Sequence, residues 1–445
     1  MLNQCSSELR TWWPALLLAL CVQAQAQTAS EEPAASEARL APPTAAPLGI
    51  TPPVGPPADP FVDESRRGYL LSSGWRVIPA LNLTYVSDSN PLMLYPSSGT
   101  DGIRALNLAL TVKSATPGLF SGFFVTGTVH HDALQNQSEK PALAQLLYTP
   151  KVDDWTLPLT YVYSRNKLSR SSLLSQNSNV PPVSAQDTVL NQFTADAIRQ
   201  FGSTGLSVGV TWADVQIGSS LLANGQTLNS SSSYTTQTER AKITRPAGTY
   251  AQWFVRGQAD EYRYGSGSQT QVGSRKSNLW TWAGGLQGML AQGLSYTGEV
   301  GRARKTSTSD QVPGSTSTVA ALNFMWNPDA STNAVFGVNR SVFETNLPSI
   351  SNVVANSPFA MISRRISPSL IVQANATLSH IQAVPVSADL TDKSGTLTLL
   401  WKPHPALLFA ASVGRTLRGI SPPVAAAGLN PFSQTKYLVN MTWYP

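Results

Sequence analysis

Charged residues are scarce in this chain. Only 13% of its 445 residues are Asp, Glu, Lys or Arg, with 31 basic and 25 acidic side chains, against about 25% in a typical soluble domain. Hydrophobic residues make up 42% of the sequence, so hydroxyl and amide side chains take the place of the missing charges. The composition therefore indicates a polar chain that carries little charge.

Long hydrophobic runs are missing as well. The longest, residues 12–22, spans 11 residues, whereas a membrane-spanning helix needs about 20. Disorder over the whole length is excluded by 11 Trp, 13 Tyr and 13 Phe, because so many aromatic side chains must be buried or anchored. An all-β chain remains, either a large soluble one or a membrane barrel.

Cysteine is nearly absent, and both copies, Cys5 and Cys21, lie within residues 1–26. This segment is typical of a cleavable signal peptide, with Arg10, the apolar run and a small-residue site before Gln27. A lipoprotein is the alternative, but Leu20 stands where its motif requires a small residue. We expect an exported mature chain without disulfides, which a closed barrel does not need.

Residues 27–67 are rich in proline. Nine prolines fall between positions 28 and 63, among Ala, Glu and Ser. Such a composition favours an extended segment without a packed core. We predict a disordered periplasmic spacer at 27–67, followed by a single domain at 68–445.

Residues 68–445 alternate between apolar and small polar side chains, in stretches of about 10 to 14 residues. One example has Leu370, Val372 and Leu378 on one face, and Gln373 and Asn375 on the other. This period of two is typical of a strand with two different surroundings. A soluble sandwich would place Lys and Glu on its outer face, and these are scarce here. The pattern favours one face in lipid and the other in water.

Connection lengths alternate too. Short connections at 114–118, 150–154, 202–204, 245–248, 290–292, 327–331, 367–368 and 403–405 are interleaved with longer ones, such as 88–102, 169–187 and 419–433. Short periplasmic turns and long outer loops characterise outer-membrane barrels. We therefore predict a transmembrane antiparallel β-barrel of about 18 strands. The fallback is 16, because the strand at 231–244 has few apolar residues.

Aromatic residues accompany the short turns. They would form the periplasmic girdle at the level of the lipid headgroups, and they are Tyr148, Trp155, Trp326, Trp401 and Trp443.

Signatures of catalysis are missing. The sequence has no His-Glu-x-x-His, no Gly-x-Ser-x-Gly and no phosphate-binding loop. His130 and His131 are adjacent, so on a strand they face opposite sides and cannot share a metal. We expect no enzyme, no metal and no cofactor.

Several strands end on a basic residue near their outer end. These are Arg165, Arg302, Arg340 and Arg415, joined by His131 and His380. With strict alternation they face outward and meet anionic lipid phosphates. With a bulge that reverses the register they ring the pore exit. In either case the predicted lumen is lined by Gln252, Arg256, Gln258, Glu299, Gln373 and Asn375.

Three short patterns carry a family resemblance. An aromatic-x-Pro turn leads into a strand that ends in Arg, at 326–340 and again at 401–415, and the opening strand at 77–85 is followed by Asp88-Ser89-Asn90. Together these resemble the outer-membrane β-barrel porin family associated with exopolysaccharide biosynthesis and export. The resemblance implies an outer-membrane channel for a secreted polysaccharide, and it supplies no catalytic residues.

We expect the barrel to pass an exopolysaccharide, or hydrophilic solutes generally, through a polar lumen. Its expected partners are outer-membrane lipid, the polysaccharide and periplasmic export machinery, and no nucleic acid. One alternative is a general diffusion porin, which should carry a strongly charged constriction loop, whereas 169–187 carries only Arg170 and Asp187. A second alternative is a structural or adhesive barrel whose loops bind a partner.

Overall fold

The computed structural model describes most of the chain after residue 67. The described residues are 61, 68–90, 99–116, 118–132, 138–168, 186–218, 220–221, 227–228, 233–264, 275–308, 314–344, 352–384, 388–421 and 431–445. The predicted signal peptide and, apart from Phe61, the predicted spacer lie outside them. No helix within these ranges is long and apolar enough to cross a membrane.

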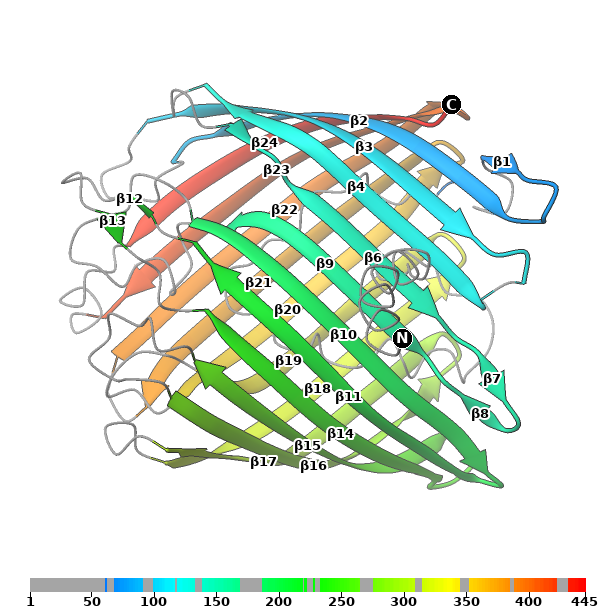
Figure 1. The fold of residues 1–445 in the computed structure, drawn as a ribbon, viewed down its shortest axis with the longest axis vertical. Helices are drawn as coiled ribbons and strands as arrows, with labels where there is room; N and C mark the ends of the chain where they lie inside the picture. Colours follow the sequence, from blue (N-terminus) through cyan, green and yellow to red (C-terminus); the bar gives the residue numbers. More distant parts are fainter. Residues whose placement is uncertain are drawn as a thin grey trace, which may run out of the picture.

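Eighteen long strands form the body of the molecule (Figure 1). They are β2 (Arg76–Asp88), β3 (Asp101–Lys113), β4 (Phe120–His131), β6 (Ala142–Tyr148), β9 (Leu159–Leu168), β10 (Gln186–Phe201), β11 (Thr204–Ile217), β14 (Tyr234–Pro246), β15 (Ala251–Tyr264), β16 (Arg275–Ala291), β17 (Leu294–Ser307), β18 (Ser315–Asp329), β19 (Thr332–Phe343), β20 (Asn352–Ser367), β21 (Leu370–Val384), β22 (Ala388–His404), β23 (Leu407–Ile420) and β24 (Phe432–Trp443).

Six further strands in the described part of the chain have two residues each. They are β1 (Tyr69–Leu70), β5 (Ser138–Glu139), β7 (Lys151–Val152), β8 (Trp155–Thr156), β12 (Ser220–Leu221) and β13 (Thr227–Leu228). All of them belong to connections or flank the barrel, and β7 and β8 form a small hairpin between β6 and β9.

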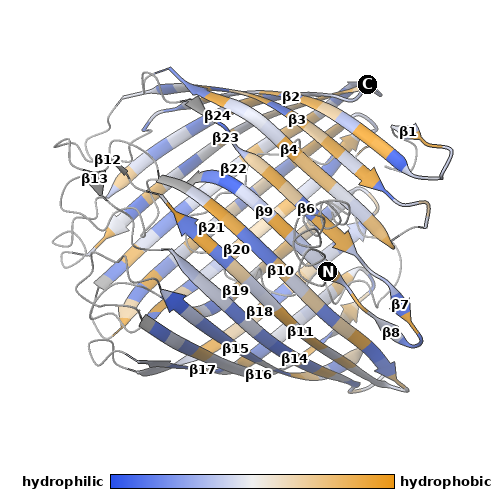
Figure 2. Ribbon diagram, viewed as in Figure 1, coloured by the Kyte–Doolittle hydropathy of each residue, from blue (hydrophilic) through white to orange (hydrophobic). Residues whose placement is uncertain are grey.

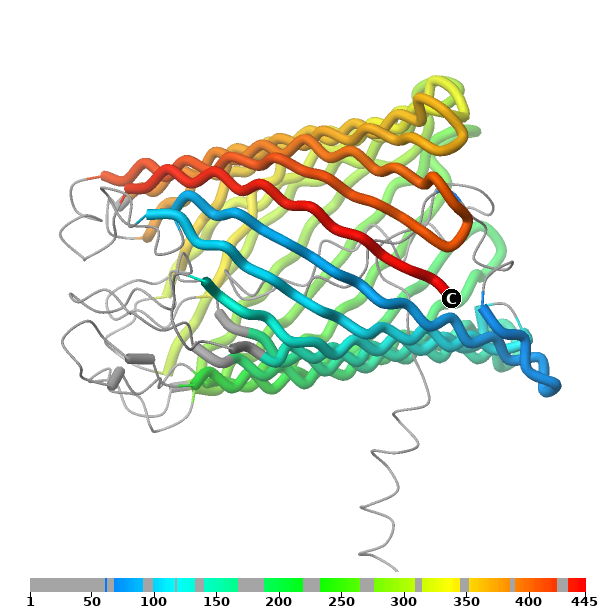
Figure 3. Tube along the Cα trace, turned by 90° about the horizontal axis from the view of Figure 1, so that it is seen from above, coloured from blue at the N-terminus to red at the C-terminus, as the bar shows by residue number. Residues whose placement is uncertain are grey.

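The long strands close into one antiparallel barrel. Each pairs with its neighbour in the chain, and β2 pairs with β24, from Leu81 opposite Trp443 to Asp88 opposite Lys436. Figure 3 shows the first barrel strand lying beside the last. Closure leaves no unpaired strand edge, which satisfies the backbone hydrogen bonds within a membrane. The predicted fold class and the count of 18 are therefore confirmed.

The long strand with the fewest apolar residues, β14, is fully formed. β14 pairs with β11 and with β15 along most of its length. Its apolar residues are few because its inward face carries Thr238, Arg240 and Lys242, and register with the neighbouring strands determines its place. The fallback of 16 strands is not needed.

The two ends of the barrel differ. At one end, here called the turn end, five of the eight connections between long strands have two residues each. Gly293 closes the connection between β16 and β17 with φ of 75°, a conformation that residues with a Cβ rarely adopt. The opposite end, here called the loop end, carries the longer connections. The described register shifts all lie near the turn end, after Met289, Trp326, Arg365 and Trp401.

Side chains alternate between the outside and the inside of the barrel. Trp212, Trp280 and Leu397 point outward and are about half exposed, although they are large and apolar. The residues next to them along the strands, such as Thr211 and Thr396, point inward. Figure 2 shows this alternation as hydrophobic and hydrophilic blocks along the strands. A hydrophobic exterior of this kind suits lipid rather than water.

The inward face also contains apolar clusters near the turn end. Ala80, Ala109 and Val125 form one of them. Another joins Ile371, Leu400 and Ala410, and Phe61 packs against it. Phe61 therefore lies at the inner wall of the barrel, on the side where the short turns are.

Candidate functional site

The candidate site is the inner wall of the barrel. Residues that are directly opposite each other on paired strands share a face, so the register determines which side chains point inward. All six residues predicted to line the lumen point inward. Gln252, Arg256 and Gln258 lie on β15, Glu299 on β17, and Gln373 and Asn375 on β21.

Arg256 and Glu299 form an ion pair across the intervening strand β16. The guanidinium donates from Nε and Nη2 to the two carboxylate oxygens at 2.7 and 2.6 Å. This two-point geometry is the favoured one for Arg and a carboxylate. Both side chains are about four-fifths buried, so the pair is only partly screened by water.

Gln258 takes part in a second contact of the same wall. Its amide nitrogen donates to both oxygens of Asp260, at 3.0 and 2.9 Å, and Thr238 on β14 donates to the same carboxylate at 2.6 Å. Asp260 is buried. Neutral donors thus solvate a carboxylate on the inner wall.

Further inward charges are paired in the same way. Arg240 on β14 binds Asp196 on β10, with both Asp oxygens at 2.7 Å from Nη2. Arg418 on β23 binds Asp392 on β22 at 2.7 Å. Near the loop end, Lys305 meets Glu344 at 2.7 Å. These acids and bases compensate each other locally, so none of these pairs leaves a net charge on the wall.

Two glutamine side chains lie between the charged part of the wall and the turn end. Lys242 donates to Gln287 at 3.1 Å, and the amide of Gln287 donates to Gln252 at 3.1 Å. The Lys242 ammonium also lies 4.6 Å from the ring centre of Phe254, within the range of a cation–π contact.

The part of the wall next to Gln373 and Asn375 is uncharged, whereas Asp392 lies closer to the loop end and Arg365 and Lys402 closer to the turn end. Gln373 donates to Ser363 at 3.4 Å, Ser357 and Ser379 share a hydrogen bond of 2.8 Å, and Asn375 is exposed. Gln373 and Asn375 are separated from the other four predicted residues by several strands. The structure therefore places the six residues on two different parts of the wall and does not bring them into one cluster.

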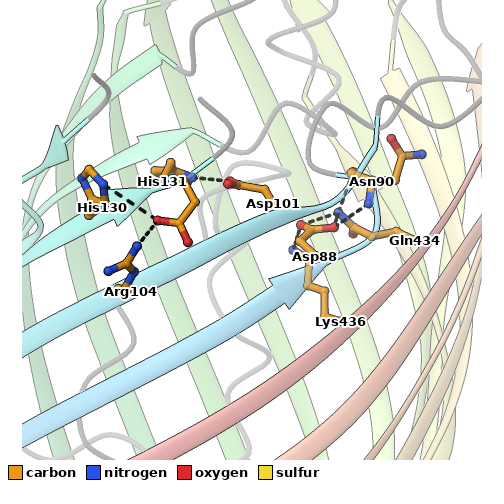
Figure 4. Close-up of polar contacts among 9 residues, drawn as sticks. Asp88, Asn90, Asp101, Arg104, His130, His131, Gln434 and Lys436 are labelled. Atoms are coloured by element: carbon orange, nitrogen blue, oxygen red, sulfur yellow. Dashed lines mark hydrogen bonds and ion pairs between the residues drawn. The ribbon is translucent and has the colours of Figure 1, made fainter. Parts of the chain in front are cut away.

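At the loop end, a polar cluster lies where β2, β3, β4 and β24 meet (Figure 4). Gln434 donates to both oxygens of Asp88 at 2.9 Å, and Lys436 approaches the same carboxylate at 3.4 Å. His131 lies 2.8 Å from Asp101, whose side chain is fully buried. This cluster forms one side of the inner rim.

For His131 the outward alternative is wrong, and the side chain points inward without a register shift. In the register of β3 and β4, His131 lies opposite Ile103 on the inward face, and its neighbour His130 lies outside opposite Arg104. His131 shares its face of β4 with apolar residues, but this face points inward, because Val125 on the same face belongs to an inward apolar cluster. Arg104 pairs with Asp132 on the outer surface (Figure 4).

The four predicted basic residues point outward. Arg302, Arg340 and Arg415 share faces with exposed apolar side chains on their own strands, and Arg165 shares its face with the partly exposed Tyr161 and Tyr163. No register shift occurs in the described loop-end halves of these strands, so the alternation is maintained. Arg340 donates to Asn356 at 2.7 Å, and His380 lies 3.1 Å from the Thr391 hydroxyl.

The five predicted girdle aromatics all lie near the turn end. Trp326, Trp401 and Trp443 are outward and between 43% and 47% exposed. Tyr148 ends β6, and Trp155 packs edge to face with Phe201, with Arg199 close to both rings. Whether these side chains meet lipid headgroups stays a prediction.

Several partners in the inner wall were not predicted from the sequence. The alternation along each strand could have placed their side chains inside the barrel; they are Asp196, Arg240, Asp260, Asp392 and Arg418. The two ion pairs join residues 26 and 44 positions apart, and Asp260 binds Thr238 22 positions away, so these contacts depend on register. In the described ranges, no three His, Cys, Asp or Glu side chains gather in a way that could hold a metal.

An antiparallel barrel of 18 strands with an apolar exterior and a polar inner wall defines an outer-membrane barrel of the porin class. Comparison with protein families agrees. Residues 74–399 match the family described as "Putative beta-barrel porin 2", and the chain belongs to this family.

Comparisons with individual proteins add little. No curated protein sequence matches the chain. Among solved structures, the siderophore receptor PirA from Pseudomonas aeruginosa is similar, with 10% identity, a TM-score of 0.45 and coverage of 83% of this chain and 80% of that one. The FrpB iron transporter from Neisseria meningitidis has 8% identity and a TM-score of 0.43, with 86% and 83% covered. Likeness at this level says nothing about function.

Proposed function

We propose that the protein is an outer-membrane channel whose cargo is an exopolysaccharide. The observation that carries this proposal is the character of the inner wall. Many of its charges are compensated in pairs, such as Arg256 with Glu299 and Arg240 with Asp196, and the side chains next to Gln373 and Asn375 are neutral. Amides and hydroxyls give weak contacts at many sites to sugar hydroxyls, which lets a glycan move without being held.

A general diffusion porin is the second candidate. It is supported by the family, whose description names a porin without a cargo, and by the presence of charges of both signs along β10 to β17. A wide barrel with a hydrated lumen passes any small hydrophilic solute unless something fills it. The two candidates therefore differ in what they expect for long glycans.

Liposome swelling separates the two candidates. Mature protein reconstituted into liposomes is exposed to neutral and acidic oligosaccharides of increasing length. If the protein is an exporter, neutral oligosaccharides should enter the liposomes even when they are larger than the largest linear polyol that enters. A porin should show one size limit for all solutes, and such a limit would contradict the exporter.

A matched pair of variants addresses the neutral wall. Asn375→Glu adds a charge to this wall, and Asn375→Gln keeps it neutral with a similar size. We expect slower passage of acidic oligosaccharides through the Glu variant and unchanged passage through the Gln variant. Equal passage of acidic oligosaccharides through both variants would show that the neutrality of this wall does not matter for transport. Liposomes that never swell, even after the loops are shortened, would favour a structural or adhesive barrel.

A further inference from the structure

The outward surface of β16, β17 and β18 carries two arginines that no group in the described part of the chain neutralises. Arg302 and Arg304 lie two residues apart on the outward face of β17, and both are exposed. Within the part of the chain that the structure describes, neither guanidinium has a hydrogen-bond or ion-pair partner. Side chains two residues apart on one strand face are about 7 Å apart, so both can reach one anion.

The neighbours of these arginines suit an anionic lipid headgroup. Trp280 lies directly opposite Arg304 on β16, and Trp282 opposite Arg302. Both indole side chains are about half exposed. On the other side, Thr316 and Thr318 of β18 lie opposite the same two arginines and offer hydroxyl groups. Tryptophan is the residue that favours the boundary between lipid tails and headgroups.

Several other outward basic residues are already engaged by this chain. Arg104 pairs with Asp132 (Figure 4), and Arg263 and Lys276 share Glu261. Arg340 donates to Asn356. In the described loop-end halves of β17 and β18 no carboxylate lies on the outward face, because Asp329 stands at the turn end of β18.

The height of the two arginines matches the outer boundary of the membrane. Ten residues separate Leu294, at the turn end of β17, from Arg304, which is about 33 Å along a strand. With a tilt of about 40°, this corresponds to about 25 Å along the barrel axis, the height of the apolar band of such barrels. Arg302 lies slightly deeper, and its long side chain can extend toward the headgroups.

We propose that Arg302 and Arg304, flanked by Trp280 and Trp282, form a binding site for the phosphate of an outer-leaflet glycolipid of the lipid A type. A phosphate monoester carries more negative charge than the phosphodiester of a phospholipid and offers three oxygens to two guanidinium groups. Arginine binds such a group through paired hydrogen bonds. The site lies outside the lumen and is independent of what the barrel conducts.

Native mass spectrometry of the folded full-length mature barrel tests this site. The protein is titrated with diphosphorylated lipid A and, separately, with phosphatidylglycerol. We expect the glycolipid to bind the wild type more tightly, and Arg302→Gln/Arg304→Gln to weaken its binding by about tenfold or more, because two hydrogen bonds between charged groups are lost. Arg302→Lys/Arg304→Lys keeps the charge and should lose less affinity.

Arg104→Gln is the matched control. It removes one outward loop-end arginine that Asp132 already neutralises, and it should leave glycolipid binding unchanged. Wild-type affinity in the Gln double variant would overturn the proposal, as would an equal loss in Arg104→Gln, because binding would then follow overall charge. Equal affinity for phosphatidylglycerol and lipid A would overturn the choice of ligand. Migration of unheated and heated samples on gels confirms that each variant is folded.

Discussion

Arg256 and Glu299 show how single residues control the charge of the inner wall. Each neutralises the other across β16, and Lys242 lies directly opposite Arg256 on β14. Removing one partner therefore leaves an uncompensated charge beside the conduction path, and its sign depends on which partner is removed.

Ion selectivity measures this charge. Glu299→Gln should make the channel more selective for anions, and Arg256→Gln more selective for cations. We expect a change of up to about sevenfold in the ratio of the two permeabilities, since a unit charge about 7 Å away in water shifts the energies of an anion and a cation by about 0.6 kcal/mol each, in opposite directions. Reversal potentials in a KCl gradient give the ratio.

The double variant is the control for the pair. Arg256→Gln/Glu299→Gln removes both charges and should return the reversal potential close to that of the wild type. A reversal potential that stays unchanged in both single variants would contradict a position of this pair beside the conduction path.

The first and last barrel strands, β2 and β24, meet at a seam that closes the barrel. On its inner side, Asn82 donates to Thr442 at 2.9 Å and accepts from Thr84 at 2.9 Å. Asn440 donates to Thr84 at 2.7 Å and accepts from Thr442 at 3.2 Å. All four are buried. Polar groups that satisfy one another in this way favour one register at the point where the barrel closes.

Replacing Asn82 should weaken this seam. Asn82→Leu has a similar shape but leaves buried hydroxyls without their partner. We expect the free energy of unfolding to fall by about 2 kcal/mol or more, measured by urea unfolding of the barrel in a bilayer. Asn375→Leu, at an exposed position of the inner wall, should change stability by less than about 0.5 kcal/mol. Equal effects of the two substitutions would show that the seam contributes nothing special.

Alternation explains what could be predicted at this scale. A period of two with different faces identifies strands and assigns most side chains to the inside or outside, as it did for Gln252 and Arg302. It failed for His131, because the barrel also has apolar residues inside, such as Ala109 and Val125. Where both faces of a strand contain apolar residues, composition alone does not determine which face meets lipid.

Pairing between strands could not be predicted. Arg240 meets Asp196 only because β11, which separates their strands, fixes the register on both sides. A shift by one residue would move either side chain to the other face. The sequence therefore predicts which side chains point inward, whereas the positions of the ion pairs come from the closed barrel.

At the scale of the whole molecule, the chain forms a closed 18-strand barrel with a hydrophobic exterior, a polar inner wall and longer connections at one end. A barrel of this size encloses enough room for a hydrated path. The proposed channel therefore depends on that path being open to ions as well as to sugars.

Single-channel recording of the mature barrel in planar bilayers tests this claim most directly. We expect discrete conductance steps in KCl, and brief interruptions of the current when neutral oligosaccharides of the exported type are added. Interruptions whose frequency rises with oligosaccharide concentration would support passage of a glycan through the lumen. A folded, inserted barrel that shows no conductance steps would contradict the central claim that the protein is a channel.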